Sequence, residues 1–136
     1  MRKIYSILSL FLIVFLLSSC AQKMRFATSP VVPAATGAVK VKKDKNDNYS
    51  IDVKVVNLAN ARDLTPPKNT YVVWMESERN RVRNLGQMQP SSGLLSKTLK
   101  GELEATATSK PTRIFITAED EGNVQYPGMQ LVLSTD

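Results

Sequence analysis

The chain has 136 residues, a formal net charge of +6, one cysteine and no histidine. This length suits one ordinary domain. A single cysteine excludes an intramolecular disulfide and a cysteine-rich zinc site, and the lack of histidine removes the most common general base and transition-metal ligand. Composition therefore argues against most catalytic and metal-binding classes of protein.

The N-terminal segment has the features of an export signal. Arg2 and Lys3 precede an apolar run of 14 residues, Ile4 to Leu17, which only two serines interrupt. A helix of that length rises about 21 Å, which is less than the roughly 30 Å of a bilayer core. The pattern predicts a signal peptide over residues 1–19 and not a membrane span.

The segment Leu17-Ser18-Ser19-Cys20 resembles the lipobox of bacterial lipoproteins. The resemblance implies cleavage before Cys20, diacylation of its thiol with fatty acids such as palmitate, and a lipid-anchored protein of the cell envelope. Ala21, which follows, implies sorting to the outer membrane, facing the periplasm. An ordinary secretory signal with a coincidental Cys20 is the alternative. Cleavage would remove Arg2 and Lys3 and lower the net charge from +6 to +4.

Residues 20–36 contain Pro30 and Pro33 and show no hydrophobic periodicity, which predicts a lipidated N-terminus followed by a flexible tether. Lys23 and Arg25 lie close to the expected lipid. They either touch anionic headgroups or stay solvated, and we expect solvation because two charges make a small patch.

From Gly37 onward the apolar residues alternate with polar ones. The segments 39–42 and 49–55 alternate around the turn residues 44–48, which predicts a β-hairpin. The spacing of Asp44, Asn46 and Asn48 also resembles the start of a calcium loop. Tyr49 occupies the sixth position, where such a loop needs glycine, so we favour the hairpin.

Five further strands are expected, over residues 71–75, 82–86, 96–107, 112–118 and 129–133. Tyr71 to Met75 is apolar on both faces, which is typical of a strand in the middle of a sheet. Seven short strands with regular turn signals predict an all-β domain, an antiparallel β-sandwich over residues 37–136.

The body of the chain resembles the extracytoplasmic C-terminal domain of anti-sigma-K factors. The resemblance rests on Tyr71-Val72-Val73-Trp74-Met75, then Asn84-Leu85-Gly86-Gln87, and later Phe115-Ile116-Thr117-Ala118-Glu119, Pro127-Gly128 and Leu131-Val132-Leu133. It implies an immunoglobulin-like sandwich. Neither the sigma-binding segment nor the transmembrane helix of that family is recognised in this sequence, so the anti-sigma function does not transfer.

Two groups of residues are candidate binding sites. Trp74 is either a ligand platform with Tyr71 or Tyr126, or a core residue between the sheets. Its apolar neighbours favour the core, and the expected structural core includes Trp74, Tyr71, Val73 and Phe115. The basic residues of the two predicted hairpins either bind an anionic partner or only keep exposed strands soluble. The candidate patch comprises Arg79, Arg81, Arg83, Lys40, Lys42 and Lys54.

Paired carboxylates are the remaining candidates for chemistry. Glu102 and Glu104 share one face of a strand, and residues 119–121 form an acidic run in a predicted loop. We expect both groups to be solvated, so we expect no enzyme, no metal and no cofactor.

The sequence predicts a lipid-anchored envelope lipoprotein with a non-enzymatic binding or structural domain. Its expected partners are the membrane, through the lipid, and an envelope protein or glycan, whereas the export signal argues against nucleic acid. A sensor domain in an anti-sigma-type pathway is the alternative, and a hydrolase is a distant third.

Overall fold

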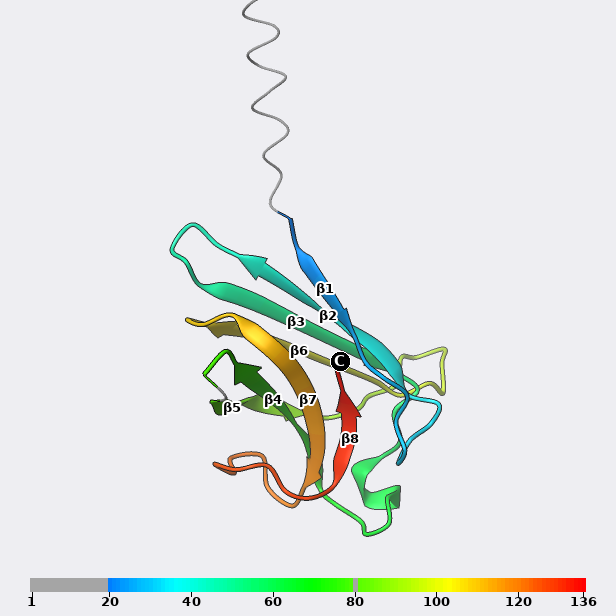
Figure 1. Cartoon of the computed structure of the whole chain (residues 1–136). Helices are drawn as coiled ribbons and strands as arrows, with labels where there is room; N and C mark the ends of the chain where they lie inside the picture. Colours follow the sequence, from blue (N-terminus) through cyan, green and yellow to red (C-terminus); the bar gives the residue numbers. More distant parts are fainter. Residues whose placement is uncertain (1–19, 80) are drawn as a thin grey trace, which may run out of the picture.

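The structure is a computed structural model that describes residues 20–79 and 81–136, so the predicted signal peptide lies outside the described residues (Figure 1). The described chain forms eight β-strands and one short 3₁₀ turn, and it contains no α-helix. In chain order the elements are β1 (Gln22–Arg25), β2 (Thr36–Lys43), β3 (Tyr49–Val56), η1 (Ala61–Asp63), β4 (Thr70–Ser77), β5 (Val82–Met88), β6 (Lys100–Ala107), β7 (Pro111–Glu119) and β8 (Leu131–Ser134).

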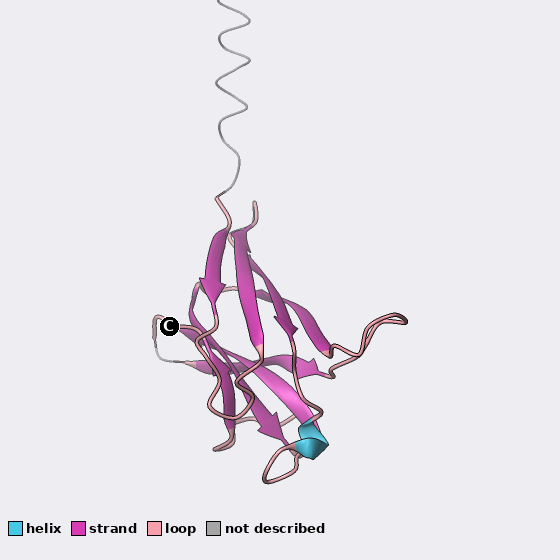
Figure 2. Cartoon of the chain, turned by 90° about the vertical axis from the view of Figure 1, so that its right-hand side faces the viewer, coloured by secondary structure: helices cyan, strands magenta, loops and turns pink. Residues whose placement is uncertain are grey.

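The strands form two four-stranded antiparallel sheets, with the orders β1-β2-β3-β6 and β5-β4-β7-β8. Figure 2 shows them as two layers, with η1 at the end opposite the start of the described chain. The predicted all-β sandwich is therefore confirmed. The sequence predicted seven of the eight strands and missed β1.

Alternation of side chains builds the core between the sheets. In β2 and β3 the inward residues Val39, Val41, Ile51 and Val53 are at most 4% exposed, while Lys40 and Asp52 between them point to the opposite face. They pack with residues of the second sheet: Tyr71, Val73, Met75, Ile114 and Ile116. The strict period of two in the sequence is the cause of this arrangement, because successive side chains of a strand point to opposite faces.

Strand β4 lies between β5 and β7, and both of its faces are buried, as its apolar sequence predicted. Its two faces belong to different clusters, however. Tyr71 and Val73 face the main core, whereas Trp74 packs with Val72, Phe115 and the partly buried Val124 in a second cluster.

The placement of Trp74 and Phe115 corrects one expectation. Both are buried, as predicted for core residues, but they lie on the outer face of the second sheet and not between the sheets. The loop after β7 supplies the cover, since Asn84 on the neighbouring β5 donates hydrogen bonds to the carbonyls of Gly122 and Val124 at 3.0 and 2.9 Å. Apolar residues on both faces of a strand cannot by themselves indicate which face meets the other sheet.

The flexible tether expected over residues 20–36 is also corrected. Residues 22–25 form β1, which pairs with β2, and Met24 is buried. The next residues stay attached to the sandwich: Ala27 N donates to Ser134 O at 2.9 Å, and Val32 and Ala35 are buried. A four-residue strand with one inward apolar side chain is too short to show periodicity in the sequence.

Candidate functional site: the basic edge beside Cys20

Cys20 lies at the edge of the sandwich, directly before its first strand. It is exposed and has a free thiol. One residue, Ala21, separates it from β1, and the first residue of β1, Gln22, pairs with Val41 near the end of β2. The register therefore places Cys20 beside the β1–β2 edge, at the end of the sheet where the β2–β3 hairpin turns (Figure 1).

The outer face of the first sheet has its charges separated by sign. One row across the sheet reads Lys23, Lys40, Asp52 and Glu104, and the next reads Arg25, Ala38, Lys54 and Glu102. Strands β1 and β2 thus carry only basic charges on this face, β3 carries one of each sign, and β6 carries two carboxylates with Lys100 at its first residue. We call Lys23, Arg25, Lys40 and Lys42 the basic edge.

The charges of the basic edge are available to a partner. Its four side chains are exposed, and among the described residues none of them lies within 4 Å of a carboxylate. Lys54 lies 3.8 Å from Asp52 in the same strand, so its charge is partly compensated. Lys43 lies 3.1 Å from Asp47 in the hairpin turn, and the hydrogen bond and charge of that carboxylate raise the pKa of Lys43.

The structure divides the six predicted patch residues between two surfaces. Lys40, Lys42 and Lys54 lie on the outer face of the first sheet, as expected. Arg79, Arg81 and Arg83 belong to the second sheet, in β5 and its connection to β4, a connection that also contains the undescribed Asn80.

The arginines have a neighbour that the sequence did not suggest. Arg79 and Arg81 line a pocket of about 320 Å³ together with Lys110 from the β6–β7 turn. This turn is close to them because β7 pairs with β4 at Ser77.

The basic edge itself was also missed as a unit. Lys23 and Arg25 were expected in a solvated tether, but pairing of β1 with β2 brings Lys23 opposite Lys40. The sequence Lys23-Met24-Arg25 does alternate, and this was the one local signal for a strand with an outward basic face.

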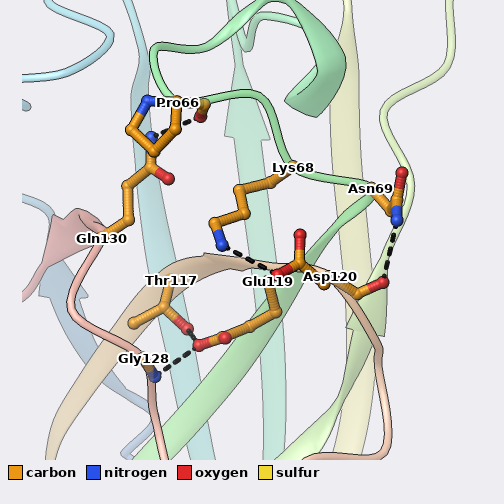
Figure 3. Close-up of polar contacts among 8 residues, drawn as sticks. All are labelled: Pro66, Lys68, Asn69, Thr117, Glu119, Asp120, Gly128 and Gln130. Carbon is orange, nitrogen blue, oxygen red and sulfur yellow. Dashed lines mark hydrogen bonds and ion pairs between the residues drawn. The ribbon is translucent and has the colours of Figure 1, made fainter.

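The predicted acidic groups have different environments. Glu102 and Glu104 are exposed on the outer face of β6, as expected. Glu119 is not a solvated loop residue: it ends β7, is 7% exposed, and its Oε1 accepts hydrogen bonds from Thr117 Oγ1 and Gly128 N, both at 2.6 Å (Figure 3). The returning loop that carries Gly128 buries the carboxylate.

The Glu119 hydrogen bonds belong to a longer polar chain. Trp74 Nε1 donates to Thr117 Oγ1 at 2.8 Å, which leaves the Thr117 hydroxyl proton for Glu119. Beside it, Lys68 Nζ lies 3.0 Å from Asp120 Oδ2 (Figure 3). Each group has a partner within the fold, so this cluster fastens the loop after β7 to the sheet.

The residues whose spacing resembles a calcium loop form a turn. Asp44 Oδ1 accepts hydrogen bonds from Asn46 N at 2.7 Å and Asn48 N at 3.0 Å, so the carboxylate stabilises the hairpin connection. Among residues 20–79 and 81–136 there is no group of three side chains placed to hold a metal ion.

Comparison with protein-family models, curated proteins and solved structures finds no match. Within the described part of the chain, no helix has the length and apolar character needed to cross a membrane.

Proposed function

We propose that the protein is an envelope lipoprotein whose Cys20 carries the lipid and whose sandwich is a non-enzymatic binding module. The observation that carries the proposal is the position of Cys20: the only cysteine of the chain follows Leu17-Ser18-Ser19 and is exposed at the start of the folded domain. A modifying enzyme can reach such a thiol, and two or more acyl chains make the attachment to a bilayer stable.

The non-enzymatic part of the proposal is supported by the environments of the acidic groups. Glu102 and Glu104 are exposed, and Glu104 continues a cross-strand row that contains Asp52 and Lys40. The buried Glu119 uses one oxygen for Thr117 and Gly128. A general acid of a hydrolase instead needs a free carboxyl facing a substrate cleft, beside a second catalytic carboxylate.

Mass spectrometry of the mature protein tests the anchor. We expect an N-terminal peptide that begins at Cys20 and carries diacylglyceryl on sulfur, together with incorporation of a labelled palmitate analogue. The Cys20→Ser variant should lose the label and remain unprocessed. An unlipidated peptide starting elsewhere, or normal cleavage and release of the variant, would indicate an ordinary secretory signal and contradict the proposal.

Cross-linking in intact cells, followed by recovery of the lipoprotein, tests the binding role. Recovery of an outer-membrane complex or a glycan supports the binding module. Recovery of an inner-membrane regulator would instead favour the alternative of a sensor domain, which the resemblance of residues 70–87 to anti-sigma-K factors motivates.

A further inference from the structure

The absence of a tether changes how an anchored domain would meet the membrane. Ala21 alone links Cys20 to β1, and two extended residues span only about 7 Å. With the lipid in place, the domain cannot move far from the bilayer. The sandwich is therefore expected to stay within about one Debye length, roughly 8–10 Å, of the lipid headgroups.

The separation of charge on the first sheet selects one side for that contact. The basic edge, Lys23, Arg25, Lys40 and Lys42, adjoins Cys20, whereas Glu102 and Glu104 lie on β6 at the other edge of the same sheet. Protection of exposed sheet edges explains charged residues at both edges, but it does not require opposite signs at the two edges. An anionic surface accounts for this segregation, because it attracts the basic edge and repels the carboxylates of β6.

Two of the exposed apolar residues lie at the end of the domain away from the anchor. Leu94 and Leu95 are fully exposed in the connection between β5 and β6, and this connection joins the ends of these strands that lie away from Cys20. Contact near the anchor is therefore electrostatic and does not involve these leucines.

We propose that the basic edge rests on the anionic headgroups of the bilayer that holds Cys20, so that β1 and β2 lie along the membrane and β6 faces away from it. The inference rests on the proposed lipidation of Cys20. It adds a definite orientation of the anchored domain, which leaves the β6 edge and the β5–β6 loop accessible to other envelope components.

Two exposed threonines report on this orientation. Thr36 lies on the outer face of β2, level with residue 27 of the β1 register and thus about 23 Å from Cys20 along the strand. Thr106 lies level with residue 21 but three strand spacings from β1, about 14 Å away. A domain lying on the basic edge brings Thr36 to the headgroups, whereas a domain standing on its hairpin end brings Thr106 closer.

The experiment uses the full-length chain, expressed and processed in cells, in the variants Thr36→Cys and Thr106→Cys. Cys20 is the only native cysteine, so once it is lipidated each introduced thiol is the only one available for a spin label. The proteins are reconstituted into vesicles of phosphatidylcholine with phosphatidylglycerol, and the label's collisions with a headgroup-attached nickel chelate are measured. We expect stronger relaxation at Thr36 than at Thr106. We also expect the difference to disappear in vesicles of phosphatidylcholine alone or at about 1 M salt, where the Debye length is about 3 Å.

Charge reversal provides the matched control. Lys40→Glu with Lys42→Glu changes four units of charge on the basic edge, and at about fivefold per unit it should lower the ratio of docked to undocked domains at least a hundredfold. Lys97→Glu with Lys110→Glu changes the net charge equally but at two residues outside the strands of the first sheet, and it should leave the Thr36 signal unchanged. Retained fluorescence of Trp74 shows that each variant is folded.

The possible outcomes separate the two proposals. A purified chain without lipid contradicts the proposed function, and this inference with it. A lipidated chain in which Thr106 is the closer residue, or in which Thr36 is equally close on neutral vesicles, contradicts the inference alone. The inference is also contradicted if residue 36 is shielded from solvent only in native envelopes and not on anionic vesicles. The basic edge would then bind another envelope component and not the lipid headgroups.

Discussion

Tyr71 offers a quantitative test of the packing between the sheets. Its side chain is fully buried in β4, and its hydroxyl donates a hydrogen bond to Ala59 O at 2.8 Å. Burial, with a smaller contribution from the negative charge of Asp63, raises the pKa of Tyr71 to about 12. We predict that Tyr71→Phe will lower stability at neutral pH and raise it, relative to the native protein, in alkali.

The sign of the effect follows from linkage. Because the pKa of the folded state lies above that of the unfolded chain, about 10, the folded protein favours the neutral phenol. The free energy that the raised pKa of Tyr71 contributes to folding is fully present below pH 10, and it is lost as the pH rises through 10 toward 12. Two pKa units correspond to about 2.7 kcal/mol in full, of which about 1.4 kcal/mol is lost by pH 11. Loss of the hydrogen bond to Ala59 costs the variant about 1 kcal/mol at neutral pH.

These magnitudes predict that the stability curves of the native protein and Tyr71→Phe cross between about pH 10 and 11. Urea denaturation from pH 7 to pH 11, followed by fluorescence of the single tryptophan, measures both curves. Other groups titrate in this range as well, but they do so in both proteins and cancel in the difference. Two parallel curves over the whole range would refute the claim that burial holds the Tyr71 phenol neutral.

Other residues give simpler tests. Thr117→Val keeps the side-chain volume but removes the hydroxyl between Trp74 Nε1 and Glu119 Oε1. The free energy of unfolding should therefore fall by about 1–3 kcal/mol, and the tryptophan emission should shift. An unchanged emission spectrum would count against this polar chain. Ile51→Ala removes a fully buried side chain and should cost about 2–5 kcal/mol in chemical denaturation. Leu95→Ala, at an exposed loop position, should stay within about 0.5 kcal/mol in the same assay, and a larger loss would mean that the loop packs against the domain.

Strand periodicity accounts for the part of the fold that the sequence predicted. Val39, Val41, Ile51 and Val53 alternate with polar residues, so a two-residue period assigned both the hairpin and its buried face. The strand of Tyr71 to Met75 was recognised as central because both of its faces are apolar. The face on which Trp74 lies was wrong, because a strand buried on both sides has no sequence signal that separates its faces.

The candidate site depended on contacts between distant segments. Lys23 and Arg25 became part of a surface only through pairing with β2, and Glu119 was buried only because a loop nine residues later in the chain returns to it through Gly128. The alternation of Lys23, Met24 and Arg25 is too short to identify a strand, and a hydrogen bond across a loop leaves no sequence pattern at all.

The sequence by itself determined the export signal prediction, the position of Cys20 and the all-β class, because each depends on local order and on a two-residue period. Only the tertiary structure decided that β1 replaces the tether, that the basic residues divide between two surfaces, and that Trp74 packs outside the main core. The physical reason is that strand register joins residues far apart in the chain. One pairing, Lys23 opposite Lys40, turned scattered charges into a basic edge beside the proposed anchor.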